Sequence, residues 1–570
     1  MKILFISPPM GNWAPWGDRH LACNPLHAQL AAFIREKKVA QVDVLDCRAM
    51  GLDDNQMMEE VIRKQPDVAF FGTLIAAAGG AAPLNRFHAA MKRIKESAPE
   101  TITVAGGLMY TAIPKEIMDA NPQIDFVIVN VFGDCEYTLW ELLEELKNPT
   151  PKVSEIKGLV HRKNGEIVLN PARGLIANLD ELPTPAYDLF PMDRYYGYSV
   201  IPNYNEAVTS RGCEGACHFC YEWWLVDPRN PRDFTSHRSR GGKKVADEME
   251  LLNKQYGVKA LTFMDDDFNS DRQKMVDLVE ELEKRKLDLS WFILGRAQNF
   301  IRDADLIPRL RKVGMYQVLI GIDGGTDEEI AEARKGPMKV GVKELKELIQ
   351  YLRKNDISTI ATYLNGFWED DEAKIRQRAR AVDGIDPDIV MIQLLNPIPG
   401  SPIWRLAVKE NIIEVKDMSL WDVEHCVMPT KHLNRKQLGE IRADEDDRFS
   451  VCCRLADQTI NLRFGADVDS ACRLVQQKNI CILMKHSCDG NLLLIPTREF
   501  EDHLARCPGF DLQSIHPTAY GFLSFSQIQN SKPAVRSQGA VCHVVGNRAD
   551  LCQPLTFAVF GDQPHAGGNS

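Results

Sequence analysis

The chain has 570 residues, of which 44% are hydrophobic and 26% are charged, and its formal net charge is −11. This length predicts about two to four domains, and the acidic balance without a basic run argues against a nucleic-acid partner. No apolar run approaches the roughly 20 residues of a membrane span. The first ten residues, MKILFISPPM, show no apolar signal core, which predicts a cytoplasmic protein.

Residues 1–147 alternate between short apolar runs and amphipathic stretches. The apolar runs are KILFIS, VDVLD, VAFFGT, ITVAGG and FVIVNVFG, and helical patterns such as HAQLAAFIREKK separate them. Continuous apolar strands that alternate with amphipathic helices are typical of a parallel sheet covered on both faces. The pattern therefore predicts a doubly wound α/β domain whose ligand lies beyond the carboxyl ends of its strands.

Glycines gather in the loops that follow these strands. The positions are Gly72, Gly79, Gly80, Gly106, Gly107 and Gly133. Backbone without side chains lets a large, flat ligand approach closely, and left-handed turns are the alternative reason for a glycine at each position.

Residues 148–205 are rich in proline and aromatic residues, as in LDELPTPAYDLFPMDRYYGY, which predicts a linker rather than a domain. Residues 206–440 then repeat a strand–helix unit about six times, which predicts a partial (β/α)6 barrel with its chemistry on the loops after the strands. Residues 441–570 show poor periodicity and hold eight of the 15 cysteines without a C-x2-C pair. The sequence does not indicate a role for this region. Its cysteines are consistent either with scattered thiols or with a second metal cluster.

The loop after the first barrel strand, SRGCEGACHFC at residues 210–220, carries Cys213, Cys217 and Cys220 at the spacing C-x3-C-x2-C. A structural zinc site takes four ligands, and His218 would be cramped as the fourth beside Cys217. A four-iron cluster held by only three cysteines leaves one iron open for a substrate. The aromatic residues Tyr221, Trp223 and Trp224 follow, either to shield such a cluster from water or to pack the next helix.

This loop and three later motifs resemble the radical S-adenosylmethionine (SAM) superfamily. The later motifs are MDDDF (264–268), NGFWED (365–370) and PIPGSPIW (397–404), in the order the family has them. Upstream, VAGGLMYTAIPKEI and VNVFGDCEYTLWELLEEL resemble the cobalamin-binding domain of the B12-binding subclass, and LDELPTPAYDLFP resembles its inter-domain connector. The resemblance covers roughly residues 1–440.

The resemblance implies a role for each matching residue. Cys213, Cys217 and Cys220 would ligate a [4Fe-4S] cluster, with the amino and carboxylate groups of SAM on the fourth iron. An acidic loop would receive the SAM ammonium group, although a solvated strand end or helix cap is the alternative reading of its three aspartates. The remaining SAM contacts would come from the loops after later strands, where this chain has GIDGG in place of the family's Gly-x-Glu-Ser. The implied SAM-binding residues are Asp265, Asp266, Asp267, Gly321, Asp323, Gly366, Glu369, Pro399 and Gly400.

The same resemblance implies that the N-terminal domain binds cobalamin, with Thr73, Gly106 and Gly107 beside the cofactor. The Asp-x-His-x-x-Gly run that ligates cobalt in other cobalamin domains does not occur here, and Leu108-Met109 stand where relatives commonly place histidine. The resemblance therefore implies cobalt without a protein imidazole from this motif.

These features lead to the hypothesis of a radical SAM enzyme that cleaves SAM reductively and acts as a cobalamin-dependent methyltransferase on an unactivated carbon. An anaerobic oxidative cyclase of the Mg-protoporphyrin monomethyl ester type is the alternative, and a non-catalytic corrinoid or iron–sulfur sensor is the third hypothesis. We expect a small-molecule substrate and an external one-electron reductant such as flavodoxin or ferredoxin. The sequence does not indicate the substrate. The candidate residues of its pocket are Arg211, Glu222, Trp224, Arg296 and Gln393.

Overall fold

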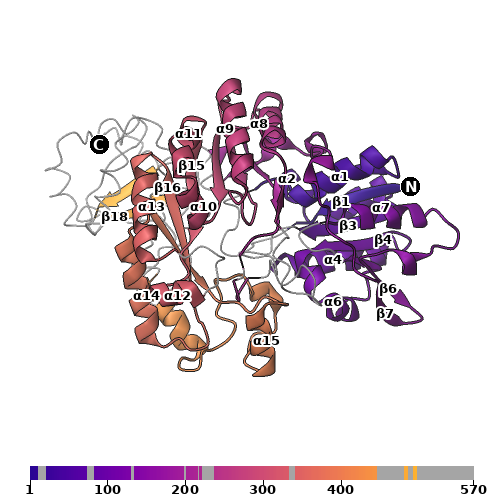
Figure 1. Ribbon diagram of the computed structural model, residues 1–570. Coiled ribbons are helices and arrows are strands. Elements are labelled where there is room, and N and C mark those ends of the chain that lie inside the picture. Colours follow the sequence, from indigo (N-terminus) through magenta and orange to yellow (C-terminus); the bar gives the residue numbers. More distant parts are fainter. Residues whose placement is uncertain are drawn as a thin grey trace, which may run out of the picture. The chain divides into compact units, whose positions relative to one another are not determined.

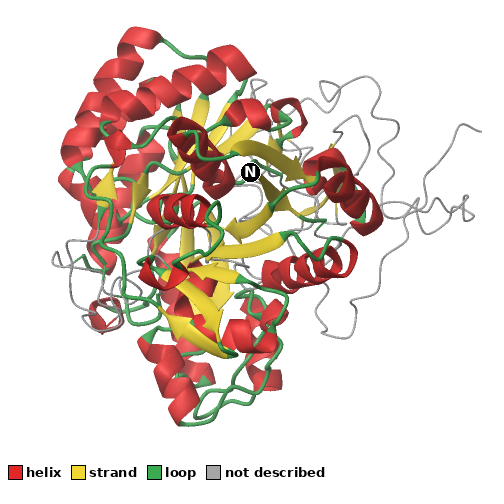
Figure 2. Ribbon diagram, turned by 90° about the vertical axis from the view of Figure 1, so that its right-hand side faces the viewer, coloured by secondary structure: helices red, strands yellow, loops and turns green. Residues whose placement is uncertain are grey.

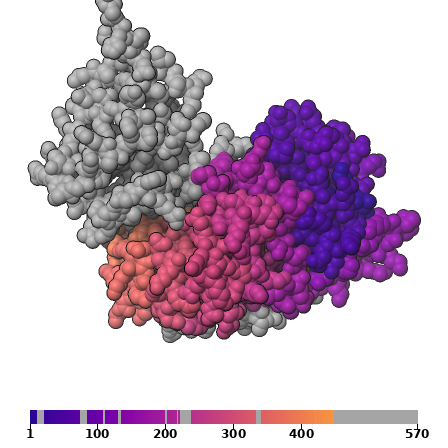
Figure 3. All heavy atoms as spheres, turned by 90° about the horizontal axis from the view of Figure 1, so that it is seen from above, coloured from indigo at the N-terminus to yellow at the C-terminus, as the bar shows by residue number. Residues whose placement is uncertain are grey.

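The computed structural model describes residues 1–9, 21–73, 82–129, 134–197, 201–215, 217–220, 237–332 and 340–445, and two strands between residues 480 and 496. Residues whose placement is uncertain are grey in Figures 1 and 3. The chain divides into two units, Met1–Pro387 with Met391–Gly439, and Asp388–Val390 with Glu440–Ser570. Within the described residues, no helix combines the length and the apolar character needed to cross a bilayer.

The first unit opens with a seven-stranded sheet in the order β2-β1-β3-β4-β5-β6-β7. Its first five strands are parallel and coincide with the five apolar runs of the sequence, which confirms the doubly wound fold. They are β1 (Lys2–Ser7), β2 (Gln41–Asp46), β3 (Val68–Thr73), β4 (Ile102–Gly107) and β5 (Phe126–Ile128).

Helices cover both faces of this sheet because successive strand residues point to opposite sides. Leu4 and Ile6 of β1 pack with residues of α3, α4 and α6, whereas Phe5 packs against His27 of α1, with ring centroids 5.6 Å apart. Figure 1 shows α1 and α4 on opposite sides of the strands. The helices are α1 (Pro25–Lys37), α2 (Cys47–Met50), α3 (Asp54–Lys64), α4 (Ala82–Ser97), α5 (Leu108–Ala112), α6 (Pro114–Ala120) and α7 (Glu136–Glu145).

Part of the expected linker belongs to this domain. Strands β6 (Leu159–Lys163) and β7 (Glu166–Leu169) form an antiparallel hairpin that pairs with β5 and extends the sheet. The left-handed Asn164 and Gly165 between them supply the turn that the proline-rich neighbourhood obscured. The rest of the segment is short 3-10 turns, η4 (Leu179–Glu181), η5 (Tyr187–Leu189) and η6 (Met192–Arg194), and the strand pair β8 (Tyr196–Gly197) and β9 (Ile201–Pro202).

The barrel strands form a six-stranded sheet in the order β10-β13-β14-β15-β16-β17, which is the order in which they occur along the chain. This arrangement confirms the predicted partial barrel. Figure 2, a view from the N-terminal side, shows strands in yellow and the helices around them in red. The strands are β10 (Tyr204–Ala207), β13 (Ala260–Phe263), β14 (Ser290–Leu294), β15 (Met315–Gly321), β16 (Ser358–Asn365) and β17 (Ile389–Leu394).

Of the helices between these strands, α9 and α14 begin at an aspartate cap, and α8 and α9 pack closely against each other. Asp271 accepts hydrogen bonds from the amides of Gln273 (2.9 Å) and Lys274 (3.1 Å) at the start of α9. A Cβ on Gly242 would lie 2.3 Å from the carbonyl oxygen of Lys274, so the contact between α8 and α9 requires glycine there. The helices are α8 (Gly242–Tyr256), α9 (Arg272–Arg285), α10 (Ala297–Arg302), α11 (Ile307–Lys312), α12 (Asp327–Glu332), α13 (Val342–Lys354) and α14 (Glu372–Ile385).

After β17 the chain forms α15 (Pro402–Lys409), the 3-10 turn η10 (Met418–Leu420) and a helix at residues 435–445. Of the second unit, the structure describes Asp388–Val390, residues 440–445 and the antiparallel pair β18 (Ile480–Met484) and β19 (Leu492–Pro496). Seven of its eight cysteines lie outside the described residues, and Cys481 is described only by its backbone in β18.

Candidate functional site: the cysteine loop

The cysteine loop follows β10 and the short strand β11 (Ser210–Arg211), which pairs with β12 (Arg238–Ser239). A Cβ on Gly215 would lie 3.3 Å from the Cys213 Sγ, 3.6 Å from the Cys217 Sγ and 3.6 Å from Nη1 of Arg296. Two of the three predicted ligand sulfurs therefore flank one glycine. A turn in which the amide of Cys220 donates to the carbonyl of Cys217 (3.0 Å) brings in the third cysteine.

All three cysteines are partly buried, and none of the described cysteines is in a disulfide. Burial raises the pKa of the Cys213 thiol well above its usual value; Asp267 raises it further, and Arg296 opposes the shift. Among the described residues, no three histidine, cysteine or acidic side chains are spaced to bind a single metal ion. A four-iron cluster takes one thiolate for each ligated iron, so its cysteines do not converge on one point.

Arg296 follows β14 and reaches the cysteine loop. Its side chain is 12% exposed, and its Nη1 lies 3.7 Å from Oδ2 of Asp267. In the described part of the chain, neither of its two terminal nitrogens has a hydrogen-bond partner. An enclosed guanidinium without its hydrogen bonds is suited to bind a carboxylate, which it can hold by two parallel N–H···O bonds.

The three aspartates of the acidic loop occupy different environments. Asp265 is fully buried, and its carboxylate accepts hydrogen bonds from Thr209 and Ser210, which follow β10. Asp266 is exposed, and Asp267 is fully buried. The contacts of Asp265 favour a structural role, which was the alternative reading of these aspartates, whereas SAM binding by Asp266 and Asp267 stays a prediction.

Asp267 faces the cysteine loop. Its Oδ2 lies 3.7 Å from the Sγ of Cys213, and its Oδ1 accepts a hydrogen bond from Asn299 (3.3 Å). Burial raises the pKa of the Asp267 carboxyl, and Arg296 and His237 oppose the shift. Asp267 and Arg296 therefore bring one acidic and one basic side chain to Cys213.

The end of β15 and the loops after β15 and β16 carry four of the predicted SAM contacts, Gly321, Asp323, Gly366 and Glu369. Gly321 ends β15, and Asp323 adopts a left-handed conformation with φ of 52°. After β16, Gly366 has φ of 97°, and its amide donates to the buried Asp370 (3.0 Å). Glu369 instead lies at the surface, where its carboxylate pairs with Lys431 (3.0 Å). The buried acidic residue of this loop is therefore Asp370, and the surface ion pair of Glu369 does not favour its predicted contact with SAM.

The turn at Pro399 and Gly400 leads into α15, whose N-cap is Ser401; the Ser401 hydroxyl accepts from the amide of Trp404 (3.1 Å). The amide of Ile403 in turn donates to the carbonyl of His218 in the cysteine loop (3.4 Å). The rings of His218 and Phe219 lie 5.8 and 6.0 Å from the ring of Phe367. Phe219 and Phe367 pack against the apolar cluster that contains Leu364, Leu395 and Ile403. Apolar side chains thus cover one side of the loop, whereas Tyr221, Glu222, Trp223 and Trp224 lie outside the described residues.

At the carboxyl edge of the N-terminal sheet, Thr73 pairs with Gly107 and Gly72 pairs with Gly106. A Cβ on Gly72 would lie 2.5 Å from the Gly106 carbonyl oxygen, and one on Gly106 would lie 2.9 Å from the Phe70 ring. Close packing within the sheet is a reason for these two glycines that neither sequence-based interpretation considered. The side chains of Thr73, Leu108 and Met109, and Gly79, Gly80 and Gly133, lie outside the described residues.

Arg211 was a candidate substrate contact, and the structure places it elsewhere. Its side chain is 6% exposed and forms ion pairs with Asp134 (2.6 Å) and Glu136 (2.5 Å) of the N-terminal domain. Sequence reasoning missed both acidic partners, although a charged residue next to an apolar strand run was a signal for them. Gln393 of β17 is half-buried.

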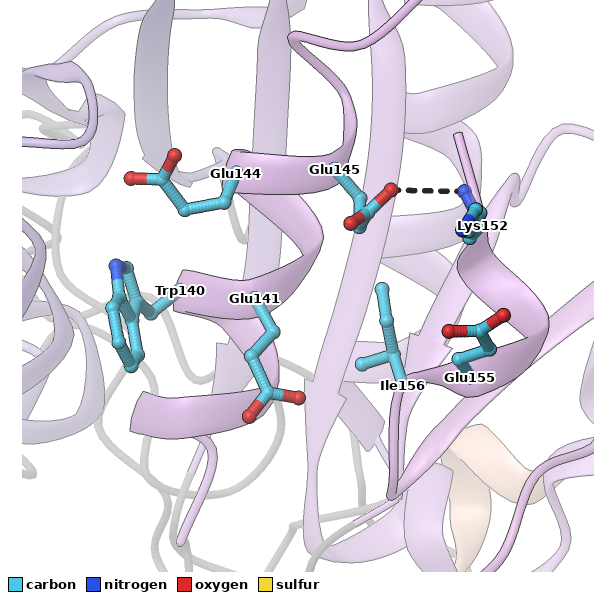
Figure 4. A pocket seen from close by; sticks show the side chains of 7 residues that line it. All are labelled: Trp140, Glu141, Glu144, Glu145, Lys152, Glu155 and Ile156. Carbon is cyan, nitrogen blue, oxygen red and sulfur yellow. Dashed lines mark hydrogen bonds between the residues drawn. The ribbon is translucent and has the colours of Figure 1, made fainter. Parts of the chain in front are cut away.

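A surface hollow of about 310 Å³ is lined by residues between 140 and 156, which precede the cysteine loop in the sequence. Figure 4 shows its side chains on α7 and on the segment around the 3-10 turn η3 (Val153–Glu155). Four glutamates line it, and Glu145 accepts from the amide of Lys152 (2.9 Å). It is lined by Trp140, Glu141, Glu144, Glu145, Lys152, Glu155 and Ile156, which include none of the predicted site residues.

Comparison with known proteins identifies the domain that carries the cysteine loop. The family described as the radical SAM superfamily matches residues 207–378. An uncharacterized methyltransferase of Pyrococcus horikoshii is 25% identical over 450 residues, which cover 77% of this chain and 90% of that protein. An anaerobic magnesium-protoporphyrin IX monomethyl ester cyclase of Rubrivivax gelatinosus is 24% identical, over 77% of this chain and 75% of that protein.

Among solved structures, the fold is similar to that of the cobalamin-dependent S-adenosylmethionine radical enzyme OxsB, solved with aqua-cobalamin and SAM bound. The TM-score is 0.63 at 15% identity, and the match covers 84% of this chain and 70% of that one. Residues 207–378 of this chain therefore form a radical SAM domain, and the fold that the chain shares with OxsB extends on both sides of that domain.

Proposed function

We propose that the chain is a radical SAM enzyme that cleaves SAM reductively at a [4Fe-4S] cluster, and that it is a cobalamin-dependent methyltransferase acting on an unactivated carbon of a small molecule. The observation that carries the proposal is the placement of Cys213, Cys217 and Arg296 around Gly215 at the carboxyl end of the first barrel strand. This is the end of a β/α barrel where active sites occur.

The side chains around the cysteine loop fit a cluster with SAM bound to it. Three cysteines would each ligate one iron, and the fourth iron would remain open for the amino acid part of SAM. The terminal nitrogens of Arg296, which lack hydrogen-bond partners among the described residues, would then receive the SAM carboxylate. Asp267 would limit the rotation of this guanidinium from 3.7 Å away.

When bound, the reduced cluster supplies one electron that breaks a carbon–sulfur bond of SAM, which yields methionine and a 5′-deoxyadenosyl radical. The protein contributes binding, orientation and exclusion of water. Phe219 and Phe367 keep water from one side of the loop, and Arg296 and Asp267 fix the position of the charged end of SAM.

The N-terminal domain fits a corrinoid at the carboxyl edge of its sheet, where doubly wound domains bind their ligands. Neither His27 nor His88 of this domain is placed to ligate cobalt there. His27 is enclosed by Phe5 and Phe70, and His88 packs against Tyr110. We therefore propose cobalamin bound without an imidazole from His27 or His88.

An anaerobic assay with methyl-labelled SAM tests the proposed methyl transfer. The reconstituted protein is incubated with a low-potential reductant, cobalamin and extracts of small molecules, and products are separated by mass. Label in a product, together with 5′-deoxyadenosine and S-adenosylhomocysteine, is the expected result. A chain that binds the cluster but forms neither nucleoside product would be a non-catalytic sensor, and the proposal would be wrong.

An oxidative cyclase is the second candidate, because the similarity to the Rubrivivax gelatinosus cyclase is about as strong as that to the Pyrococcus horikoshii protein. The same assay separates the two functions. A cyclase would give a product that gains oxygen from water without gaining the methyl label.

An external one-electron donor such as flavodoxin or ferredoxin would supply the electron, and the enzyme would work in the cytoplasm. Replacing the chemical reductant by a purified flavodoxin with its reductase tests the donor. SAM cleavage at a comparable rate is the expected outcome, and fractionation of the producing cells tests the location.

A further inference from the structure

Four charged side chains form a buried cluster between the N-terminal domain and the cysteine loop. Nη1 of Arg211 donates to Oδ1 of Asp134 (2.6 Å) and to Oε2 of Glu136 (3.2 Å), and its Nη2 donates to Oε1 of Glu136 (2.5 Å). Nη1 of Arg238 donates to Oδ2 of Asp134 (2.6 Å). Each of the four residues is at most 9% exposed.

The two arginines face one another as direct partners of the β11–β12 pair. Like charges at such positions repel, and burial adds a desolvation cost. Asp134 and Glu136 balance the two positive charges. The arrangement of β11 and β12 therefore depends on two carboxylates from another domain.

The four charged residues lie close in the chain to the proposed ligand-binding segments of both domains. Arg211 lies two residues before Cys213 in the chain. Asp134 and Glu136 lie between the carboxyl end of β5 and the first turn of α7, at the edge where doubly wound domains bind ligands. The amide of Ile176 also donates to Asp134 (2.8 Å), which ties the connecting segment to the same carboxylate.

A second buried cluster joins the same elements. Arg240, which directly follows β12, donates to Glu248 of α8 (3.0 Å), to the Gln29 side chain of α1 and to the carbonyl of Pro183 (3.1 Å). Tyr187 donates to the same Glu248 (2.5 Å). The strand that pairs with the start of the cysteine loop is thus fixed to the N-terminal domain by Arg238 and, just beyond its end, by Arg240.

We infer that Arg211 and Glu136 are positioning residues that couple the corrinoid edge of the N-terminal domain to the cysteine loop. Assembly of the [4Fe-4S] cluster in that loop therefore also orders the start of α7. The inference rests on the proposed function, because it assigns the two domain edges to two cofactors. By linkage, the factor by which the [4Fe-4S] cluster changes cobalamin affinity equals the factor by which cobalamin changes the affinity for the [4Fe-4S] cluster.

The test measures hydrogen exchange in the peptide 134–146 of the full chain in the absence of cobalamin. It compares the chain with a reconstituted [4Fe-4S] cluster and the chain without one. The wild-type chain is expected to exchange about 5-fold more slowly or better in this peptide once the cluster is loaded. The variants are Glu136→Gln and the double substitution Arg211→Met with Glu136→Met. The double variant removes one charge of each sign and leaves Asp134 paired with Arg238, so its interior stays neutral.

Glu141→Gln is the matched control, since Glu141 lies on the same helix but pairs with Arg173 near the surface. We expect the control to keep the slowing and both variants to lose it, with iron and sulfide contents equal to those of the wild type. The affinity for hydroxocobalamin, titrated by absorbance, is expected to be higher in the cluster-loaded wild type than in the cluster-free chain, and equal in the two states of the double variant.

The outcomes separate the inference from the proposed function. Absence of iron from the wild-type chain would count against the proposed function alone. A loaded wild type without slowed exchange in residues 134–146, or a double variant that retains the slowing, would overturn the inference. Because the double variant preserves charge balance, it decides the question even if Glu136→Gln does not fold.

Discussion

Asp265 and Thr209 are joined by three hydrogen bonds. The Thr209 amide donates to Oδ1 (3.0 Å) and Oδ2 (3.2 Å) of Asp265, and the Thr209 hydroxyl donates to Oδ1 (3.0 Å). The buried ammonium of Lys274 donates to the same hydroxyl (3.0 Å) and lies 4.0 Å from the carboxylate. Asp265 thereby fixes the strand that leads into the cysteine loop.

The main effect of substituting Asp265 should therefore be a loss of folding stability. Asp265→Asn leaves Lys274 without its neutralising charge in the interior, and we expect a loss of about 3 kcal/mol in the free energy of unfolding. Asp266→Asn, at an exposed position, should change stability by less than about 0.5 kcal/mol and raise the KM for SAM. Urea unfolding and SAM-cleavage kinetics check both, and equal stability of the two variants would contradict the structural role of Asp265.

The cysteine loop yields a prediction about metal content. Cys213→Ala, Cys217→Ala and Cys220→Ala should each lose most of the iron and sulfide and all SAM cleavage, because each removes one thiolate of the cluster. Cys426→Ala is the control, since its thiol donates to the Met428 carbonyl (3.3 Å) outside the loop. Full iron content in any of the three loop variants would show that the cluster is held elsewhere.

Arg296 should act on SAM affinity rather than on cluster assembly. Arg296→Met removes a charged hydrogen-bond donor worth about 1.5–3 kcal/mol, which corresponds to a roughly 10- to 150-fold weaker binding of SAM. The change in the electron paramagnetic resonance spectrum of the reduced cluster on SAM addition measures this binding. Arg309→Met, which removes an exposed partner of Glu283, should leave it unchanged. Undiminished SAM binding by Arg296→Met would exclude the carboxylate contact.

The glycines at the carboxyl edge of the N-terminal sheet should resist substitution for reasons of packing. Gly72→Ala would place a Cβ 2.5 Å from the Gly106 carbonyl oxygen, and we expect a loss of about 1–3 kcal/mol. Gly174→Ala, where a Cβ meets no atom within 4 Å, is the matched control and should be neutral. Thermal unfolding of both variants without cofactors is the measurement. A Gly72→Ala variant as stable as the wild type would leave ligand approach as the reason for this glycine.

Burial of His27 should make stability depend on pH. Desolvation lowers its pKa to about 3, so the native state keeps the ring neutral while the unfolded chain binds a proton below pH 6.5. The contribution is therefore fully present above pH 6.5 and declines as the pH falls toward 3, by about 1.4 kcal/mol per pH unit. Urea unfolding at pH 7.5 and 5.5 should show this loss in the wild type.

The variant His27→Phe keeps an aromatic ring between Phe5 and Phe70 and removes the titrating group. Its loss of stability between the two pH values should be about 1.4 kcal/mol smaller than that of the wild type. His432→Phe, at a half-exposed ring, serves as the control. An unchanged pH dependence in His27→Phe would mean that this ring is charged or hydrated in the native state.

The sequence alone was sufficient for the five parallel strands of the N-terminal sheet, for the barrel and for the position of the cysteine loop, but not for the β6–β7 hairpin. Most of the five parallel strands of the N-terminal sheet and of the six barrel strands are largely apolar, because a strand buried on both faces has no polar side. The first barrel strand, β10, is an exception, since it carries the buried polar residues Asn205 and Glu206. The cysteine spacing is likewise local, so three residues within one loop reveal the candidate metal site.

Only the tertiary structure decided which charged residues serve the site and which serve the fold. Asp265 and Asp267 are two residues apart, yet one is held by Thr209 while the other faces Cys213. Glu369 and Asp370 are adjacent, yet only Asp370 is buried. Arg211 meets Glu136 across 75 residues of chain. The direction of a side chain at a strand end and the partner it meets depend on contacts between distant segments, and no local pattern encodes those contacts.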